Sequence, residues 1–233
     1  MMMLVTLPAQ PKRFRRLIPR LAAAVILCAT AARAAEPATI TFTLDFPASD
    51  PERYSISVSA DGHSKYDCSA KISQDSDERE TYQAEFELSP GGRKHVFDLA
   101  AQAHFFSGKV DSGNSKLAFT GSKTLTYKDG EHNGSAKYNY SSLPAVQQLT
   151  NFFQNLSATL EYGRHLAYFH RYQKLALDEE LKRMEEQARN NELSELQAVQ
   201  PVLQQILDDA SVINIVRARA ERLLEMGKAA ASH

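Results

Sequence analysis

The chain has 233 residues, of which 43% are apolar and 24% are charged, as in an ordinary globular protein. Six of its 27 Lys and Arg residues lie in the first 34 positions, and the remaining chain has 21 basic and 28 acidic side chains, a net charge of −7. A chain this acidic argues against nucleic-acid binding, which needs a basic face, and against a basic cluster that would hold it on anionic lipid.

Residues 1–34 have the pattern of a cleaved secretory signal peptide. Basic residues at positions 12–20 precede an uncharged, mostly apolar stretch at 21–32, and small residues follow at the sites that signal peptidase inspects. The apolar stretch is too short for a membrane anchor, which needs about 20 residues. We expect cleavage between Ala34 and Ala35, no membrane span afterwards, and a periplasmic or secreted protein. The paired arginines at 15 and 16 leave twin-arginine export open as an alternative to the general route.

Residues 35–142 read as a mostly β domain with one internal helix. Apolar and polar residues alternate, as in strands with one buried face, in the segments 40–46, 54–60, 66–72 and 82–88. Asp61-Gly62 predicts a tight turn between the second and third of these. Ser89 followed by Pro90 predicts the start of a helix that runs to about residue 104. Two short strands are expected after it, at 123–127 and 135–140.

Residues 143–233 are helical in pattern throughout. Apolar residues recur at helical spacing in four segments, which begin near Pro144, Leu166, Leu196 and Ile213. Acidic and basic residues one turn apart on the second segment predict a solvated face; the pairs are Asp178–Lys182, Glu179–Arg183 and Glu185–Arg189.

Strands followed by helices predict an α+β fold. We expect an antiparallel sheet with one or two packed helices, followed by an all-helical C-terminal extension. The helix that begins at Pro144 either packs on the sheet or starts a separate bundle, and the sequence leaves both arrangements open.

Several of these segments resemble those of some uncharacterised secreted bacterial proteins. The stretch Tyr54 to Gly62 with Tyr66 resembles their opening hairpin, and the stretch Thr124 to Gly130 and the helix at Pro144 follow in a similar order. The similarity covers about residues 40–175. It implies an α+β fold and export, and it implies no reaction, because that kind of family has no assigned catalytic residues.

The sequence contains no recognisable catalytic or metal-binding motif. It has neither a Gly-x-Ser-x-Gly elbow nor a Ser-x-x-Lys pair. Cys68 is the only cysteine after residue 34, and its place in an alternating row predicts a buried core thiol rather than a nucleophile. His165 and His170 cannot share a metal ion on one helix face, and Glu161 with His165 is expected to be a surface pair. We expect no metal site and no cofactor.

One cationic and aromatic concentration stands out in this acidic chain; it comprises Tyr162, Arg164, His165, Tyr168, His170, Arg171 and Tyr172. Tyr and Arg are enriched at binding hot spots. Helical spacing places Arg164, Tyr168 and Arg171 on one stripe, which we expect to face outward and contact a protein partner in the cell envelope. The alternative is a helix that packs its rings on the sheet.

Three classes of function remain open. The leading hypothesis is a non-enzymatic binding or interaction module of the cell envelope. The rival is an envelope hydrolase whose site is assembled only in three dimensions, and the third is a structural spacer whose segment 143–233 folds alone.

Overall fold

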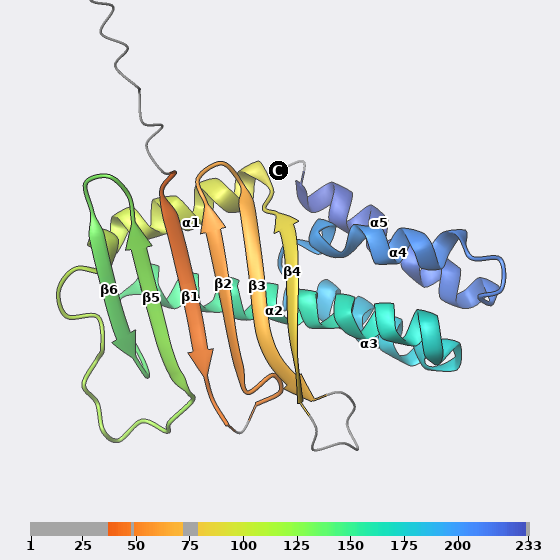
Figure 1. The fold of residues 1–233 in the computed structure, drawn as a ribbon, viewed down its shortest axis with the longest axis horizontal. Helices are drawn as coiled ribbons and strands as arrows, with labels where there is room; N and C mark the ends of the chain where they lie inside the picture. Colours follow the sequence, from red (N-terminus) through yellow and green to blue (C-terminus); the bar gives the residue numbers. More distant parts are fainter. Residues whose placement is uncertain (1–36, 48, 72–78, 232–233) are drawn as a thin grey trace, which may run out of the picture. The chain divides into compact units, whose positions relative to one another are not determined.

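A computed structural model describes residues 37–47, 49–71 and 79–231. Six strands form one antiparallel sheet in the order β4-β3-β2-β1-β5-β6 (Figure 1). The strands are β1 (Thr39–Asp45), β2 (Arg53–Ser59), β3 (His63–Lys71), β4 (Arg79–Glu87), β5 (Ser122–Lys128) and β6 (Asn133–Tyr138). The expected signal peptide and its cleavage site between Ala34 and Ala35 lie outside the described residues.

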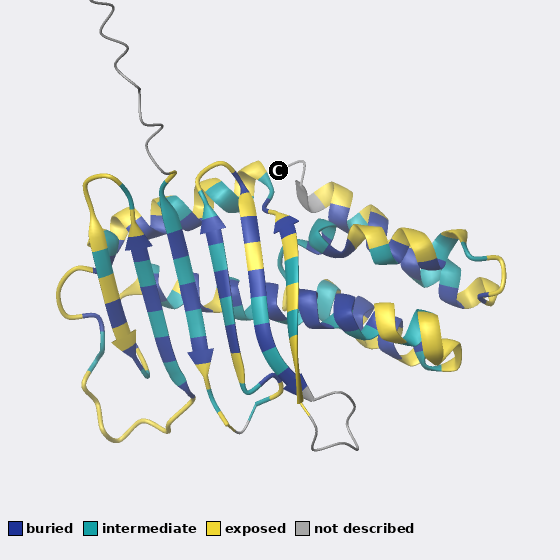
Figure 2. Cartoon of the chain, viewed as in Figure 1, coloured by how far each residue is buried: buried dark blue, intermediate teal, exposed yellow. Residues whose placement is uncertain are grey.

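One face of the sheet is apolar because alternate residues of each strand point to the same side. On β1, Ile40 is fully buried, and its antiparallel partners Val58 of β2 and Tyr127 of β5 are buried on the same face. Ser, Thr and charged residues occupy most of the opposite face. Figure 2 shows the buried positions of the strands alternating with less buried ones. There the hydroxyls of Thr41 and Ser57 lie 2.9 Å apart across neighbouring strands.

The helical segments are α1 (Pro90–Gln102), η1 (His104–Phe106), α2 (Pro144–Tyr172), η2 (Lys174–Ala176), α3 (Leu177–Arg189), η3 (Leu196–Val199), α4 (Gln200–Asp208) and α5 (Asn214–Ala231). Both α1 and α2 cover the apolar face of the sheet (Figure 1). Phe42 of β1 stacks on Phe153 of α2, with ring centroids 5.2 Å apart and planes 2° from parallel. The Ser89 hydroxyl accepts a hydrogen bond from the Gly92 N–H at 2.9 Å and so caps α1, as the sequence predicts.

The predicted α+β fold with an antiparallel sheet and a helical C-terminal region is confirmed. Buried residues of 35–142 and 143–233 belong to one core, because α2 packs on the sheet instead of starting a separate bundle. The prediction of a new helix near Leu166 is wrong: α2 continues without interruption from Pro144 to Tyr172. Gly163 lies in the middle of α2 and allows η3 to approach closely rather than ending the helix.

The half-buried carboxylate of Glu195 and the buried carboxylate of Glu185 fasten the helical region. Glu195 accepts the Ser89 N–H at 2.7 Å and the Ser89 hydroxyl at 3.0 Å, which joins the segment before η3 to the start of α1. Glu185 of α3 accepts hydrogen bonds from Arg222 at 2.7 Å and from Arg219 at 3.0 Å, both on α5. The hydrogen bond from Arg222 is the largest of several effects that together lower the pKa of Glu185.

The predicted solvated face of α3 is therefore wrong in part. Of the three expected ion pairs, only Glu185–Arg189 forms among the described residues, and Glu185 is buried. Helical spacing places acids and bases on one face, but it does not show that the arginines of α5 cover that face.

Replacing Gly163 with Ala tests the close approach of η3 to α2. The added Cβ would lie 2.5 Å from Cγ1 of Val199, which is closer than side chains pack. We expect a loss of about 1–2 kcal/mol in the free energy of unfolding, despite the better helix propensity of Ala. The same change in a Val199→Ala background should instead be neutral or stabilising. Urea unfolding of the four proteins measures this, and an equal effect in both backgrounds would contradict the packing.

Candidate functional site

The residues of α2 that the sequence singles out do not share one surface. Arg164 is only 8% exposed, so the prediction that it faces outward to a partner is wrong. Its Nε and Nη2 atoms donate hydrogen bonds to Oε2 of Glu161 at 2.9 and 2.7 Å. Tyr168 and Arg171 are exposed, as predicted.

Glu161 is a buried carboxylate between α2 and the sheet. Its Oε1 accepts a hydrogen bond from the Tyr66 hydroxyl of β3 at 2.7 Å and lies 3.4 Å from Sγ of Cys68. With Arg164 on Oε2, both oxygens of the carboxylate are occupied. The expected surface pair of Glu161 with His165 is therefore wrong, because the inward turn of α2 gives Glu161 partners from β3.

Cys68 is buried in the core, as predicted. Burial, and secondarily the neighbouring Glu161 carboxylate, raise the pKa of its thiol to about 12. The thiolate is the nucleophilic form of cysteine, and at neutral pH almost none of it is present here. Cys68 therefore has the environment of a structural thiol.

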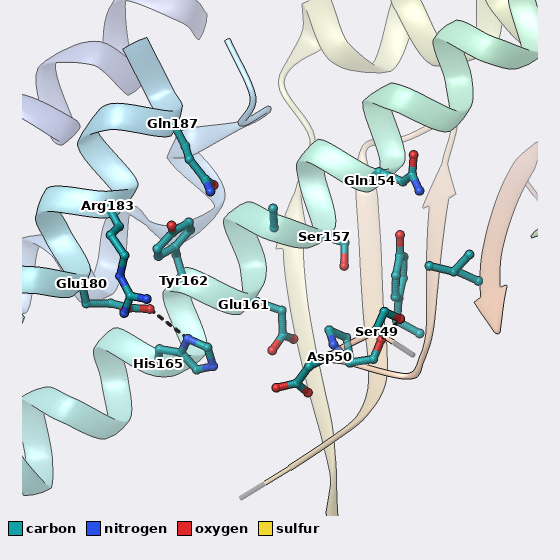
Figure 3. A pocket seen from close by; sticks show the side chains of 14 residues that line it. Ser49, Asp50, Gln154, Ser157, Glu161, Tyr162, His165, Glu180, Arg183 and Gln187 are labelled. Carbon is teal, nitrogen blue, oxygen red and sulfur yellow. Dashed lines mark hydrogen bonds and ion pairs between the residues drawn. The ribbon is translucent and has the colours of Figure 1, made fainter. Parts of the chain in front are cut away.

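A cleft of about 340 Å³ opens beside Glu161 (Figure 3). The loop between β1 and β2 forms one side of it, and α2 and α3 form the other. The polar side chains at its wall include Asp50, Gln154, Tyr162, His165 and Gln187. A hydrolase site would need at least two converging His, Asp or Glu side chains, and this cleft is lined by His165 and by the carboxylates of Asp50, Glu161 and Glu180.

Three acid and base groups of the cleft, Glu161, His165 and Glu180, are already paired with other residues of the chain. Nδ1 of His165 lies 2.9 Å from Oε1 of Glu180, and Arg183 donates to the other oxygen of Glu180. Nη2 of Arg164 lies 3.1 Å from Nε2 of His165. Because a guanidinium can only donate, Nε2 accepts and Nδ1 carries the hydrogen that is donated to Glu180. The lone pair that a general base needs is thus taken up by Arg164.

Glu180 is held in its charged form by the same neighbours. Burial alone would raise the pKa of this carboxyl, but the hydrogen bond from His165 and the charge and hydrogen bond of Arg183 outweigh it and lower the pKa. A general acid at neutral pH needs a raised pKa. Glu180 is therefore a fixed anion at neutral pH.

A second surface lies where the α2–α3 and α4–α5 turns meet. Asp209 of the α4–α5 turn accepts Nζ of Lys174 at 2.6 Å and lies 2.9 Å from Nε2 of His170. These bonds, the one from Lys174 first among them, hold the pKa of Asp209 far below its usual range. Lys174 also donates to the Ser211 hydroxyl at 2.5 Å. The two turns are therefore fastened side by side, although 35 residues separate them.

This junction, which we name the helical tip, exposes large apolar side chains beside two cations; they are Tyr168, Tyr172, Leu175, Ile213 and Ile215, with Arg171 and Lys174. The Tyr168 and Tyr172 rings lie 5.1 Å apart, and the Arg171 guanidinium lies 5.2 Å above the Tyr172 ring. Ile213 was expected on the buried face of the last helix, and that prediction is wrong. It lies directly before the first residue of α5, and 62% of its surface is exposed.

Comparison with known proteins assigns this chain to no family. No protein-family model matches the sequence, and no curated protein is significantly similar to it. Within the described ranges, no three His, Cys, Asp or Glu side chains are grouped so that they could hold a metal ion. The same ranges contain no helix that is both long enough and apolar enough to cross a bilayer.

Replacing Glu161 with Gln tests whether the carboxylate balances the buried Arg164. The change keeps the size of the side chain but leaves a buried guanidinium without its charge partner, so we expect a loss of roughly 3 kcal/mol in the free energy of unfolding. Glu80→Gln is the matched control, because the half-exposed Glu80 lies 3.9 Å from the same guanidinium. It should cost less than about 1 kcal/mol. Equal losses in urea unfolding would show that Glu161 has no special role.

Proposed function

We propose that this chain is an exported, non-enzymatic binding module of the cell envelope whose contact surface is the helical tip. The single observation that carries the proposal is the grouping of exposed apolar side chains on two turns that are fastened together. Leu175 is 97% exposed and Ile213 is 62% exposed. Soluble monomers rarely gather such side chains in one place unless the place is a contact surface.

The cleft supports the same proposal through the state of its titratable groups. Glu161, Glu180 and His165 each have their hydrogen-bonding atoms taken by other residues of the chain. A hydrolase needs at least one carboxylate or imidazole that can exchange a proton with a substrate or a water. The hydrolase alternative therefore requires either that Arg164 withdraw from His165, which the hydrogen bonds from Arg164 to Glu161 oppose, or that the exposed Asp50 at the cleft wall exchange the proton.

Export is proposed from the sequence of residues 1–34. Their basic, apolar and small-residue segments follow one another in the order of a secretory signal. Cys68 is the one cysteine after residue 34, so the exported chain would have no internal disulfide and its fold would depend on packing and ion pairs.

Photocross-linking in the native host tests the contact surface directly. A photoreactive residue placed at position 175 should give covalent adducts in living cells, because the tip is engaged with its partner there. The control is the same residue at position 117, where the native Leu is also exposed but lies on the loop before β5. Adducts at neither position, or equally at both, would contradict the proposal.

The same cells test export. The mature protein, recovered from the envelope fraction, should begin at or near Ala35. Protein from the cytoplasmic fraction with an intact Met1 would contradict export. The proposal for the contact surface would still depend on the cross-linking result.

A further inference from the structure

We propose that a second cavity, beside the first residues of β5, binds a small organic monocarboxylate through the buried ammonium of Lys123. The cavity has a volume of about 350 Å³. It is bordered by the start of β5, the end of β6 and the first half of α2 (Figure 1). We name it the Lys123 cavity. The inference goes beyond the proposed contact surface and does not depend on the helical tip.

Lys123 is a cation on the apolar face of the sheet. Antiparallel pairing places it opposite Leu44 of β1, whose side chain is buried on that face. Lys123 itself is only 4% exposed. A buried ammonium is costly to keep without an opposite charge, because the protein interior solvates ions poorly. Packing alone would therefore favour an apolar residue at this position.

No described carboxylate balances the charge of Lys123. Its Nζ donates three hydrogen bonds, which go to the carbonyl of Thr120 at 3.1 Å, the hydroxyl of Thr120 at 2.9 Å and the carbonyl of Asn139 at 3.0 Å. All three acceptors are neutral. The carboxylate of Asp111 accepts the Asn139 N–H at 2.8 Å and forms no ion pair with Lys123. Asp45, which follows Leu44 on β1, points to the other face of the sheet.

The pKa of Lys123 agrees with an unbalanced charge. Burial lowers the pKa of this ammonium, as expected for a cation that leaves water without meeting an anion. Lys123 is also the one charged residue that lines the cavity. The cavity therefore has a positive charge and no negative charge in its wall.

The rest of the wall supplies neutral hydrogen-bonding groups, which are hydroxyls of Ser, Thr and Tyr and amides of Asn and Gln. The Tyr140 hydroxyl accepts a hydrogen bond from Nε2 of Gln147 at 2.8 Å, so its own hydrogen is left to donate. In the described part of the chain, no hydrogen bond occupies the amide of Asn151 on α2 or that of Gln154, which lines both this cavity and the cleft. Free donors therefore accompany the cation.

These groups suit a monocarboxylate better than a phosphate. A carboxylate brings one negative charge, which equals the one unbalanced positive charge, and its two oxygens accept hydrogen bonds from neutral donors as well as from an ammonium. A phosphate monoester brings about two negative charges and is typically held by Arg or by backbone N–H groups at the start of a helix. The cavity is lined by no arginine.

Lys123 can bind a carboxylate without releasing the backbone. Thr120 is exposed, and its hydroxyl also lies 3.3 Å from Oδ1 of Asn139. A carboxylate oxygen can replace that hydroxyl on Nζ, while Thr120 keeps its bond to Asn139 and Lys123 keeps both carbonyls. The exchange gives the ammonium a charged acceptor in place of a neutral one, which strengthens the hydrogen bond.

Acetate titrations followed by NMR test the inference on residues 35–233, which contain every described element. Acetate supplies the carboxylate alone, and acetamide has the same shape without the charge. At constant ionic strength, acetate should shift the side-chain amide signals of Asn151 and Gln154 and reach saturation. Acetamide should bind at least about tenfold more weakly, because it lacks the charge that Lys123 attracts.

Two variants locate the binding. Lys123→Met removes the cation and should weaken acetate binding at least about tenfold while leaving acetamide unchanged. The matched control is Lys137→Met, which removes the same charge from an exposed position on β6 and should bind acetate as the original chain does. Asn151→Ala changes an exposed residue, so it should remain folded, and it should weaken acetate binding about fivefold by removing one donor.

The alternative is that Lys123 only ties the loop before β5 to the segment after β6 through the two carbonyls. Absence of acetate binding, equal binding of acetate and acetamide, or equal losses in Lys123→Met and Lys137→Met would support that alternative and overturn the inference. If Lys123→Met does not fold, the comparison of acetate with acetamide and the Asn151→Ala variant decide the question. None of these outcomes bears on the helical tip, which cross-linking tests.

Discussion

A single buried carboxylate, that of Glu161, fixes how α2 sits on the sheet. A charge in the core is tolerated only when hydrogen bonds and an opposite charge surround it, and here these come from two elements. Tyr66 donates from β3, and Arg164 donates from the next turn of α2. Because Tyr66 lies on β3 and Glu161 lies on α2, their hydrogen bond restricts the rotation of α2 about its own axis relative to the sheet.

The remaining organisation follows from that rotation. Glu161 and Arg164 are turned inward, whereas the later residues Tyr168, Arg171 and Tyr172, near the end of α2, are exposed. The turn after α2 then meets the turn after α4, and Asp209 joins them. In this acidic chain the buried and half-buried charges join one element to another. The exposed apolar side chains of the helical tip are left available for contact with another molecule.

Much of the fold can be predicted from the sequence. Strict alternation, as in Ile40, Phe42 and Leu44, identifies strands with one buried face, and Ser89-Pro90 identifies the start of α1. The continuity of α2 is harder to predict, because Gly163 and the charged residues around it look like a break. Glycine there permits the close approach of Val199, which only the fold reveals.

Most of the cleft and of the helical tip could not be predicted from the sequence. Helical spacing predicts that Arg164 is a surface residue, because arginine is usually exposed. No feature of the sequence near Arg164 indicates that Tyr66, almost a hundred residues earlier, hydrogen-bonds to the same carboxylate. The helical tip is formed by two turns that lie far apart in the chain. The sequence does not show that the turn with Leu175 and the turn beside Ile213 are held together in the fold. An exposed Leu in a short polar turn is the one signal in the sequence that could have pointed to it.

A double-mutant cycle on Tyr66 and Glu161 tests the central claim most directly. Tyr66→Phe removes only the hydroxyl, Glu161→Gln removes only the charge, and the cycle isolates the bond between β3 and α2. If the carboxylate locks the helix to the sheet, the free energies of unfolding should be coupled by at least about 1 kcal/mol, as expected for a buried hydrogen bond to a charged group. Losses that add to within about 0.5 kcal/mol would show that the two side chains act independently and would contradict the account.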